Sequence, residues 1–326
     1  MTRSGVGSRE SGGEENYSVR PTPDSRLILD TDIGTDVDDC LALALLLGSP
    51  EVRLEGITCV YGDVALRSRM CRKLLALRGG GSEAIPVSRG IERTILGVGP
   101  IHWVGHEGVG LLDDADDLPP EQDDHAVDVI VRTVMANPGQ IHLLAVGPLT
   151  NVAVAFLREP RLATAVGHLT IMGGFFRNEG DPGPIVEHNY RCDPEAAHIV
   201  LSSGAPITLV PLNVTTRVNI DTAGAARIAA VGTPFHRAVA DQVARYPTFR
   251  QRGFTHLHDP LAAACILEPD LVTFKDLYVT IELADPARAG YTHAQEPSAE
   301  RPANVRVALD VDVPAAEAAV IDRIMR

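Results

Sequence analysis

The chain has 326 residues, of which 45% are hydrophobic and 22% are charged, and this composition is ordinary for a globular protein. Its 29 Lys and Arg residues against 43 Asp and Glu residues give a formal net charge of −14, which argues against a general surface for nucleic-acid polymers or anionic membranes. No apolar stretch approaches the roughly 20 residues needed to cross a bilayer, and the five scattered cysteines form no C-x-x-C pair, so we expect a cytoplasmic enzyme with reduced cysteines.

The first 24 residues differ in composition from the rest of the chain. They are rich in Gly, Ser, Glu and Arg and contain no apolar run. This predicts that residues 1–24 form a disordered N-terminal extension and are not a secretory signal. Residues 25–326 contain no long linker or internal repeat, and we expect them to form a single domain.

An acidic segment follows the extension. The apolar run 27–29 predicts a short buried strand, and the apolar run 41–47 predicts a buried helix. Five carboxylates lie within ten residues at the intervening turn: Asp30, Asp32, Asp36, Asp38 and Asp39. Five like charges at the carboxyl end of a strand are unfavourable unless a cation or substrate hydroxyls offset their repulsion. The segment therefore predicts a metal or substrate site.

Strand and helix patterns then alternate along the chain. Strands are predicted at 52–61, 86–88, 141–146, 168–172, 207–212, near 272–282 and at 304–311. Helices are predicted at 63–77, 126–136, 150–157, 194–203, 222–231, 234–245, 259–267 and 314–325, with loops at 90–120 and 175–192. This alternation is typical of an α/β fold with a doubly wound, mostly parallel sheet flanked by helices.

Further candidate site residues are expected at the edge of the sheet where the acidic turn lies. They form the segments Tyr61-Gly62-Asp63, Glu187-His188-Asn189 and His258-Asp259. Asp193 precedes Pro194 and is expected to cap a helix. The strand ends place Asp32, Tyr61, Val146 and Gly173 along one edge of the sheet, where a site is expected.

Four motifs in this order resemble the inosine–uridine-preferring nucleoside hydrolase family, from about Arg26 to the C-terminus. They are the acidic turn, the segment 146–151 (Val-Gly-Pro-Leu-Thr-Asn), Glu187-x-Asn189 with the following 193–197, and the segment 258–262 (His-Asp-Pro-Leu-Ala). The resemblance implies a Rossmann-like domain that hydrolyses the N-glycosidic bond of a nucleoside. It also implies a homodimer or homotetramer.

The resemblance further implies one Ca²⁺ ion, which suits hard oxygen ligands. By similarity its ligands are Asp32, Asp39, Asp259 and the main-chain carbonyl of Val146. Asp32 is also the implied general base, and His258 is the implied general acid for the departing base. The implied ribose-binding residues are Asp38, Asp63, Asp181, Glu187 and Asn189.

The chain departs from the family pattern in three places. The acidic turn carries two extra residues, so Asp36 has no assigned role; it can cap the helix or replace Asp38. Asp63 and Asp181 stand where many members carry Asn, and a carboxylate only accepts hydrogen bonds. Val104 stands where some members carry a leaving-group histidine, for which His102 or His106 can substitute.

Two alternative functions share part of this sequence pattern. A haloacid-dehalogenase-like phosphatase also opens on Asp-x-Asp after a strand, but that family has no use for the late His-Asp or Glu-x-Asn motifs. A non-catalytic protein of the same fold that binds Ca²⁺ or sugar would have no need of both Asp32 and His258. The sequence does not name the preferred base or sugar, and both nucleoside salvage and a specialised metabolic role remain open.

Overall fold

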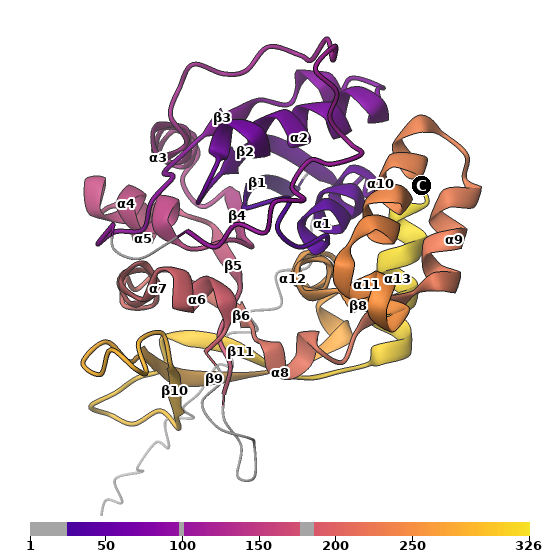
Figure 1. The fold of residues 1–326 in the computed structure, drawn as a ribbon. Coiled ribbons are helices and arrows are strands. Elements are labelled where there is room, and N and C mark those ends of the chain that lie inside the picture. Colours follow the sequence, from indigo (N-terminus) through magenta and orange to yellow (C-terminus); the bar gives the residue numbers. More distant parts are fainter. Residues whose placement is uncertain (1–24, 98–100, 177–185) are drawn as a thin grey trace, which may run out of the picture.

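The computed structural model describes residues 25–97, 101–176 and 186–326, so the predicted extension 1–24 lies outside the described residues. A nine-stranded sheet with the order β10-β9-β11-β6-β5-β4-β1-β2-β3 forms its centre (Figure 1). The strands of this sheet are β1 Ser25–Thr31, β2 Val52–Cys59, β3 Val87–Arg89, β4 Ile141–Ala145, β5 His168–Met172, β6 Ile207–Val210, β9 Val272–Ile281, β10 Thr292–Gln295 and β11 Val305–Val311. Neighbouring strands run parallel from β3 to β11, whereas β9 and β10 are antiparallel.

Helices cover both faces of the sheet (Figure 1). They are α1 Asp38–Leu47, α2 Val64–Arg78, α3 Ala126–Ala136, α4 Thr150–Arg158, α5 Leu162–Ala165, α6 His188–Cys192, α7 Pro194–Leu201, α8 Leu212–Thr215, α9 Thr222–Ala230, α10 Pro234–Arg245, α11 Pro247–Arg252, α12 His258–Leu267 and α13 Val313–Ile324. In the described ranges, none of these helices is both long and apolar enough to pass through a membrane.

The strand β1 shows why the sheet lies at the centre. Leu27, Ile28 and Leu29 are all fully buried, as expected for a parallel strand that is covered on both faces. Leu27 and Leu29 pack into a core with α1, α2, α10, α12 and α13. Ile28 packs into a second core with α3, α4 and α7 on the opposite face. Alternate side chains of one strand therefore hold the two helical layers on the sheet.

The predicted doubly wound α/β fold is confirmed, but several short elements differ from the prediction, among them α5, α11 and β10, which were not predicted. The predicted loop 175–192 contains α6, a short helix that Glu187 caps through the backbone N–H groups of Asn189 and Tyr190. A separate antiparallel pair, β7 Asn219–Asp221 with β8 Phe254–His256, was not expected. The predicted strand 207–212 ends earlier, at Val210, because Leu212 begins α8. These elements have three to six residues, too few for a clear periodic pattern.

Candidate active site

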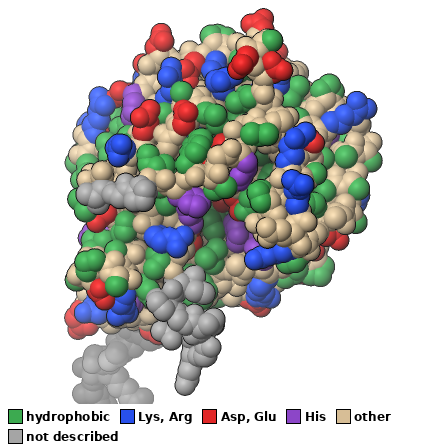
Figure 2. Space-filling model, viewed as in Figure 1, with side chains coloured by type: hydrophobic (Ala, Val, Ile, Leu, Met, Phe, Trp, Pro, Cys, Tyr) green, Lys and Arg blue, Asp and Glu red, His purple; other side chains and the backbone are tan. Residues whose placement is uncertain are grey.

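A cavity of about 580 Å³ lies at the carboxyl edge of the sheet. The strands β1, β2, β4 and β5 end there, which is where α/β sheets bind ligands. In Figure 2, histidine side chains gather around a hollow near the middle of this face. The cavity lining includes most of the predicted site residues: Asp32, Asp36, Asp38, Asp39, His102, His106, Val146, Glu187, Asn189, His258 and Asp259.

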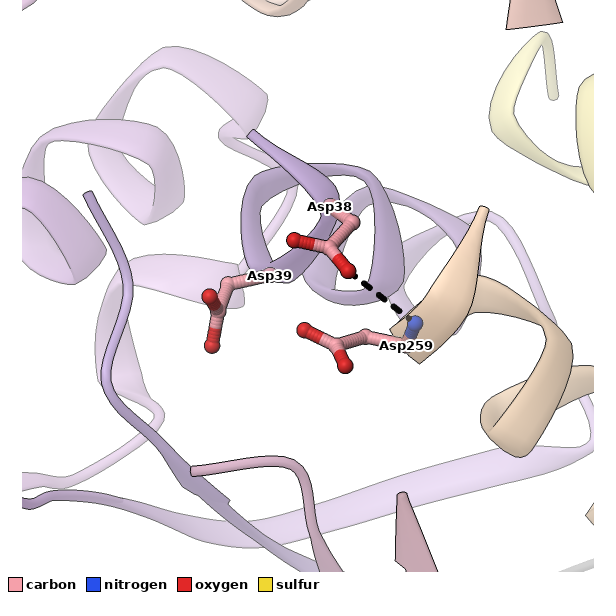
Figure 3. Close-up of side chains that lie close together, drawn as sticks. All are labelled: Asp38, Asp39 and Asp259. Carbon is pink, nitrogen blue, oxygen red and sulfur yellow. Dashed lines mark hydrogen bonds between the residues drawn. The ribbon is translucent and has the colours of Figure 1, made fainter. Parts of the chain in front are cut away.

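A cluster of three buried carboxylates forms the floor of this cavity. Asp38 and Asp39 stand in the first turn of α1, and Asp259 stands in the first turn of α12. One oxygen from each of the three lies within 4.8 Å of the others, and the side chains converge on a common space (Figure 3). The positive ends of two helix dipoles point toward these anions. Asp32 and the predicted carbonyl ligand residue Val146 line the same cavity.

The cluster holds more negative charge than the described residues offset. Burial raises the pKa of Asp38, Asp39 and Asp259 well above the usual range, and repulsion from neighbouring carboxylates raises it further. Among the described residues, the only ion pair that involves a carboxylate of the cavity lining joins Arg67 Nη2 to Asp32 Oδ2 at 3.8 Å. Buried oxygen donors with uncompensated charge are the donor set that a hard divalent cation prefers. The residues present therefore fit a metal ion.

The absence of a side chain at Gly147 leaves room for the carboxylate of Asp32. A Cβ atom at this position would lie 2.9 Å from Asp32 Oδ1 and 2.9 Å from Val60 Cγ1, and both contacts are shorter than real Cβ contacts. The preceding Val146 donates its N–H to the Asp30 carbonyl at 2.9 Å. The Gly in the segment 146–151 is thus required because two strand ends approach each other closely around Asp32.

We expect Gly147→Ala to lower kcat by about 10²-fold, because a displacement of about 1 Å at a reacting group can cost that much. The change would be measured in steady-state hydrolysis assays of the purified variant. Gly56→Ala is the matched control, since a Cβ there meets atoms only at 3.6 Å and beyond. Equal kcat values for the two variants would show that the approach of Gly147 to Asp32 is unimportant.

Asn151 and Asp30 support the floor from behind. Asn151 Nδ2 donates to Asp30 Oδ1 at 2.8 Å, and Asn151 Oδ1 accepts the N–H of Ile91 at 2.9 Å. The Thr58 hydroxyl also donates to Asp30, and burial raises the pKa of Asp30 to about 7. Asp30 therefore supports the acidic turn from behind. The structural role of Asn151 was not recognised from the sequence, because its partners are far apart in the chain.

Asp193 has more contacts than a helix cap needs. It accepts the N–H of Ala196, as the capping prediction requires, at 3.1 Å. Its other oxygen accepts the N–H of Ile95 at 2.9 Å and the hydroxyl of Thr150 at 2.6 Å. Asp193 thus joins α7 to α4 and to the segment after β3, beneath the cavity.

Glu187 and Asn189 form one wall of the cavity. The Glu187 carboxylate accepts three backbone N–H groups, from Asn189, Tyr190 and Gly174, at 2.7 to 3.1 Å. Asn189 Nδ2 donates to the carbonyl of Val146 at 2.8 Å, and a carbonyl oxygen has a second lone pair for another partner. Both side chains are held rigidly beside the acidic floor.

One predicted ribose-binding residue, Asp63, is not brought to this wall. Asp63 is exposed, and its side chain caps α2 by accepting the N–H of Leu66 at 2.9 Å. It is absent from the described lining of the cavity. Asp181 lies outside the described residues. Ribose contacts by these two residues stay predictions.

His258 is the first residue of α12 and lines the same cavity as Glu187 and Asn189. Burial, together with the neighbouring His256, lowers the pKa of His258 to about 3, so its imidazole is neutral near pH 7. His258 Nδ1 lies 2.7 Å from Thr215 Oγ1. If the threonine hydroxyl donates to Nδ1, the tautomer carries its proton on Nε2.

The segment 101–112 covers the cavity between β2 and α10. Tyr61, which follows β2 and contacts this segment, has a φ of 62°. This left-handed conformation costs a tyrosine about 1–2 kcal/mol. The Tyr61 hydroxyl accepts the N–H of His102 at 2.8 Å. The His102 ring lies 5.1 Å from the His188 ring, and the His106 ring lies 6.1 Å from that of Tyr246. His102 and His106, the two candidate leaving-group histidines, both line the cavity.

The aromatic residues Trp103, Phe249 and Phe254 pack against other parts of the protein. Trp103 packs against the guanidinium group of Arg67, with 5.2 Å between the Arg67 Cζ atom and the centre of the indole ring. Phe249 is buried in a hydrophobic core, and Phe254 packs against His256. None of these three is among the residues that line the described cavity.

A doubly wound sheet with a buried acidic cluster, fixed amide and carboxylate groups, and histidines above its carboxyl edge defines an enzyme that acts on a small molecule. Residues 27–318 match the model of the inosine-uridine preferring nucleoside hydrolase family. The chain belongs to this family, which confirms the resemblance seen in the sequence and the expectation of an enzyme of this class.

Relatives and solved structures agree with this membership. The inosine-uridine preferring nucleoside hydrolase of Leishmania major is 32% identical over 310 residues, covering 92% of this chain and 98% of the relative. Uridine nucleosidase 1 of Arabidopsis thaliana is 31% identical over 285 residues, covering 83% and 82%. The structure of a plant nucleoside hydrolase superposes with a TM-score of 0.82 at 28% identity, covering 93% of this chain and 99% of that one. The purine-preferring ribonucleoside hydrolase of Gardnerella vaginalis gives a TM-score of 0.78 at 29% identity, covering 92% and 98%.

Proposed function

We propose that the chain hydrolyses the N-glycosidic bond of a ribonucleoside, giving free base and ribose, and that it requires Ca²⁺. The observation that carries the proposal is the buried cluster of Asp38, Asp39 and Asp259, which lies in one cavity with Glu187, Asn189 and His258. Family membership supports the reaction, and the oxygen-rich donor set supports the metal.

Ca²⁺ would be held by Asp32, Asp39, Asp259 and the carbonyl of Val146, and when bound it would supply positive charge and Lewis acidity to the floor. Asp32 is proposed to accept a proton from the attacking water. Its placement between Gly147 and Arg67 keeps one carboxylate oxygen fixed. Asp38, Glu187 and Asn189 are proposed to bind the ribose hydroxyls, because their side chains border the same cavity.

The glycosidic bond breaks as water attacks the anomeric carbon, and the bonding electron pair leaves with the base. Positive charge develops on the sugar in the transition state, where the carboxylates of the floor stabilise it. The departing base carries this electron pair as negative charge. His258 is proposed to assist it by donating a hydrogen bond from Nε2–H while Thr215 holds Nδ1, and the proton that neutralises the base is taken up from water. Such help typically contributes about 10²–10⁴-fold to the rate.

The proposed setting is nucleoside salvage in the cytoplasm by a homodimer or homotetramer, carried over from the family. The relatives named for uridine, inosine and purine nucleosides guide the choice of substrates for the test below.

We expect the purified protein with Ca²⁺ to release base and ribose from at least one of inosine, adenosine, guanosine, uridine and cytidine. The matching 2′-deoxynucleoside should be hydrolysed with a kcat/KM lower by at least about 10²-fold, because the loss of one hydroxyl leaves buried polar groups unpaired. Release of base would be followed by chromatography and release of sugar by a reducing-end assay. Failure to release either product from all five ribonucleosides would overturn the proposal.

A further inference from the structure

A second, smaller pocket of about 230 Å³ adjoins the cavity. The two share four lining residues, which are Asp36, His106, Tyr246 and Pro247. The buried side chains that line the smaller pocket are apolar, namely Val37, Cys40 and Met70. Its exposed lining carries Arg245 and Arg250. The smaller pocket therefore has an apolar interior and a positively charged rim.

Asp36 and Tyr246 form a partition at the junction of the two spaces. The Tyr246 hydroxyl donates to Asp36 Oδ2 at 2.7 Å, across 210 residues of chain. The other oxygen of Asp36 accepts the N–H of Val37 at the start of α1, which fixes the carboxylate. The His106 ring packs near Tyr246, and its buried Nδ1 has no hydrogen-bond partner among the described residues. A polar atom of the shared wall is thus available to a ligand.

The smaller pocket lies toward one end of the cavity. The part of its lining that is described contains no residue of the Glu187–Asn189 wall, where the ribose hydroxyls are proposed to bind. It does contain Tyr246 and Pro247, which share the cavity with His258. In the proposed function His258 faces the departing base. The smaller pocket therefore continues the site beyond the base and not beyond the sugar.

We propose that Asp36 is a specificity-determining residue that positions Tyr246, and that this pair limits the length of the base that the site accepts. The inference rests on the proposed nucleoside hydrolysis. With the Tyr246 ring held by Asp36, a base without substituents fits and a longer one meets the ring. When the hydrogen bond is lost, the ring can turn aside and the apolar pocket takes a flat apolar substituent carried by the base. This gives the two-residue extension of the acidic turn a role in substrate choice.

The test compares adenosine with N6-phenyladenosine, which carries an aromatic ring on the exocyclic amine. We expect Asp36→Ala to raise the ratio of kcat/KM for the longer substrate to that for adenosine by about 10-fold or more, which is the scale of pocket discrimination in other enzymes. Tyr246→Phe, which loses the same hydrogen bond and keeps the ring, should raise the ratio in the same direction. Asp36→Asn retains an acceptor for the tyrosine hydroxyl and should restore the wild-type ratio.

The ratio of the two kcat/KM values distinguishes a role of Asp36 in positioning Tyr246 from a general effect of Asp36 on the acidic floor. If Asp36 acts only through charge or folding, Asp36→Ala lowers kcat/KM for both substrates equally and the ratio stays at the wild-type value, which would overturn the inference. An equal ratio in Asp36→Ala and Asp36→Asn would also overturn it. Tyr278→Phe, on strand β9 and outside both spaces, is the matched control and should keep the wild-type ratio. A different result would refute the proposed function itself: the wild-type protein would hydrolyse neither these two substrates nor any other ribonucleoside. This outcome can be distinguished from an unchanged ratio, which overturns only the role of Asp36.

Discussion

Replacing Asp32 by asparagine is expected to lower kcat for nucleoside hydrolysis by about 10³–10⁴-fold, at the upper end of what general base catalysis contributes. The substituted amide has nearly the same shape, but it cannot accept a proton from water near pH 7. It also removes one negative charge from a floor that is proposed to stabilise the positive sugar. Steady-state rates with the best ribonucleoside, taken at several Ca²⁺ concentrations up to saturation, provide the measurement.

The Ca²⁺ series distinguishes the two roles proposed for Asp32. If the residue were only a metal ligand, saturating Ca²⁺ would restore kcat to within about tenfold of the wild-type value, and the general-base role would be lost. Asp322→Asn serves as the matched control, because Asp322 is exposed on α13 and pairs there with Arg227. Exposed ion pairs contribute little to stability, so this variant should keep both the wild-type rate and the wild-type melting temperature.

Removing Ca²⁺ is expected to abolish hydrolysis and to lower the melting temperature by roughly 5–10 °C. An ion present at 100 times its dissociation constant stabilises the folded state by about 2.7 kcal/mol, and each kcal/mol corresponds to about 2–4 °C in a large domain. The physical cause is the repulsion among Asp38, Asp39 and Asp259, whose raised pKa values show how unfavourable three buried anions are without a cation. Chelation followed by thermal denaturation, with and without added Ca²⁺, tests both effects.

Variants of the proposed ligands test whether the effect of Ca²⁺ on the melting temperature arises at this site. Asp39→Asn and Asp259→Asn should each reduce the Ca²⁺-induced rise in melting temperature, because each removes a charged oxygen donor from the floor. Added Mg²⁺ should restore less activity than Ca²⁺, since the smaller ion demands near-ideal octahedral geometry. A fully active protein after complete chelation, with an unchanged melting temperature, would contradict the proposed calcium requirement.

The acidic turn could be placed from the sequence because every signal for it is local. An apolar strand, a group of carboxylates and an apolar helix follow one another within the segment 27–47, and the structure has β1 and α1 there. The mostly parallel direction of the strands also follows from the alternation of the two patterns, whereas the strand order does not. The meeting of Asp259 with Asp38 has no local signal, because 221 residues separate them. The sequence pattern predicts only that their segments share one edge of the sheet, and the resemblance to a known family assigned both residues to one site.

The remaining parts of the site depend on contacts that no pattern in the sequence encodes. Asp36 had no assigned role because its partner Tyr246 lies 210 residues away. Asn151 could be recognised as part of a motif, but not as the bridge between Asp30 and Ile91. Asp63 was expected beside ribose from its place in the motif, whereas in the structure it caps α2. A side chain's direction depends on the local backbone, and residue spacing alone does not determine it.

The wide separation of Asp38 and Asp259 also orders the events of folding. Closing so long a stretch of chain has an entropic cost that must be met before the contact contributes anything. During synthesis the strands β1 to β5 emerge well before α12, so the nascent protein carries the acidic turn without its distant partner. The proposed Ca²⁺ ligands Asp39 and Asp259 would therefore come together late, and binding of the ion would report that the C-terminal third has docked onto the sheet. Bound Ca²⁺ would then stabilise the product of the last folding step and would slow the first step of unfolding.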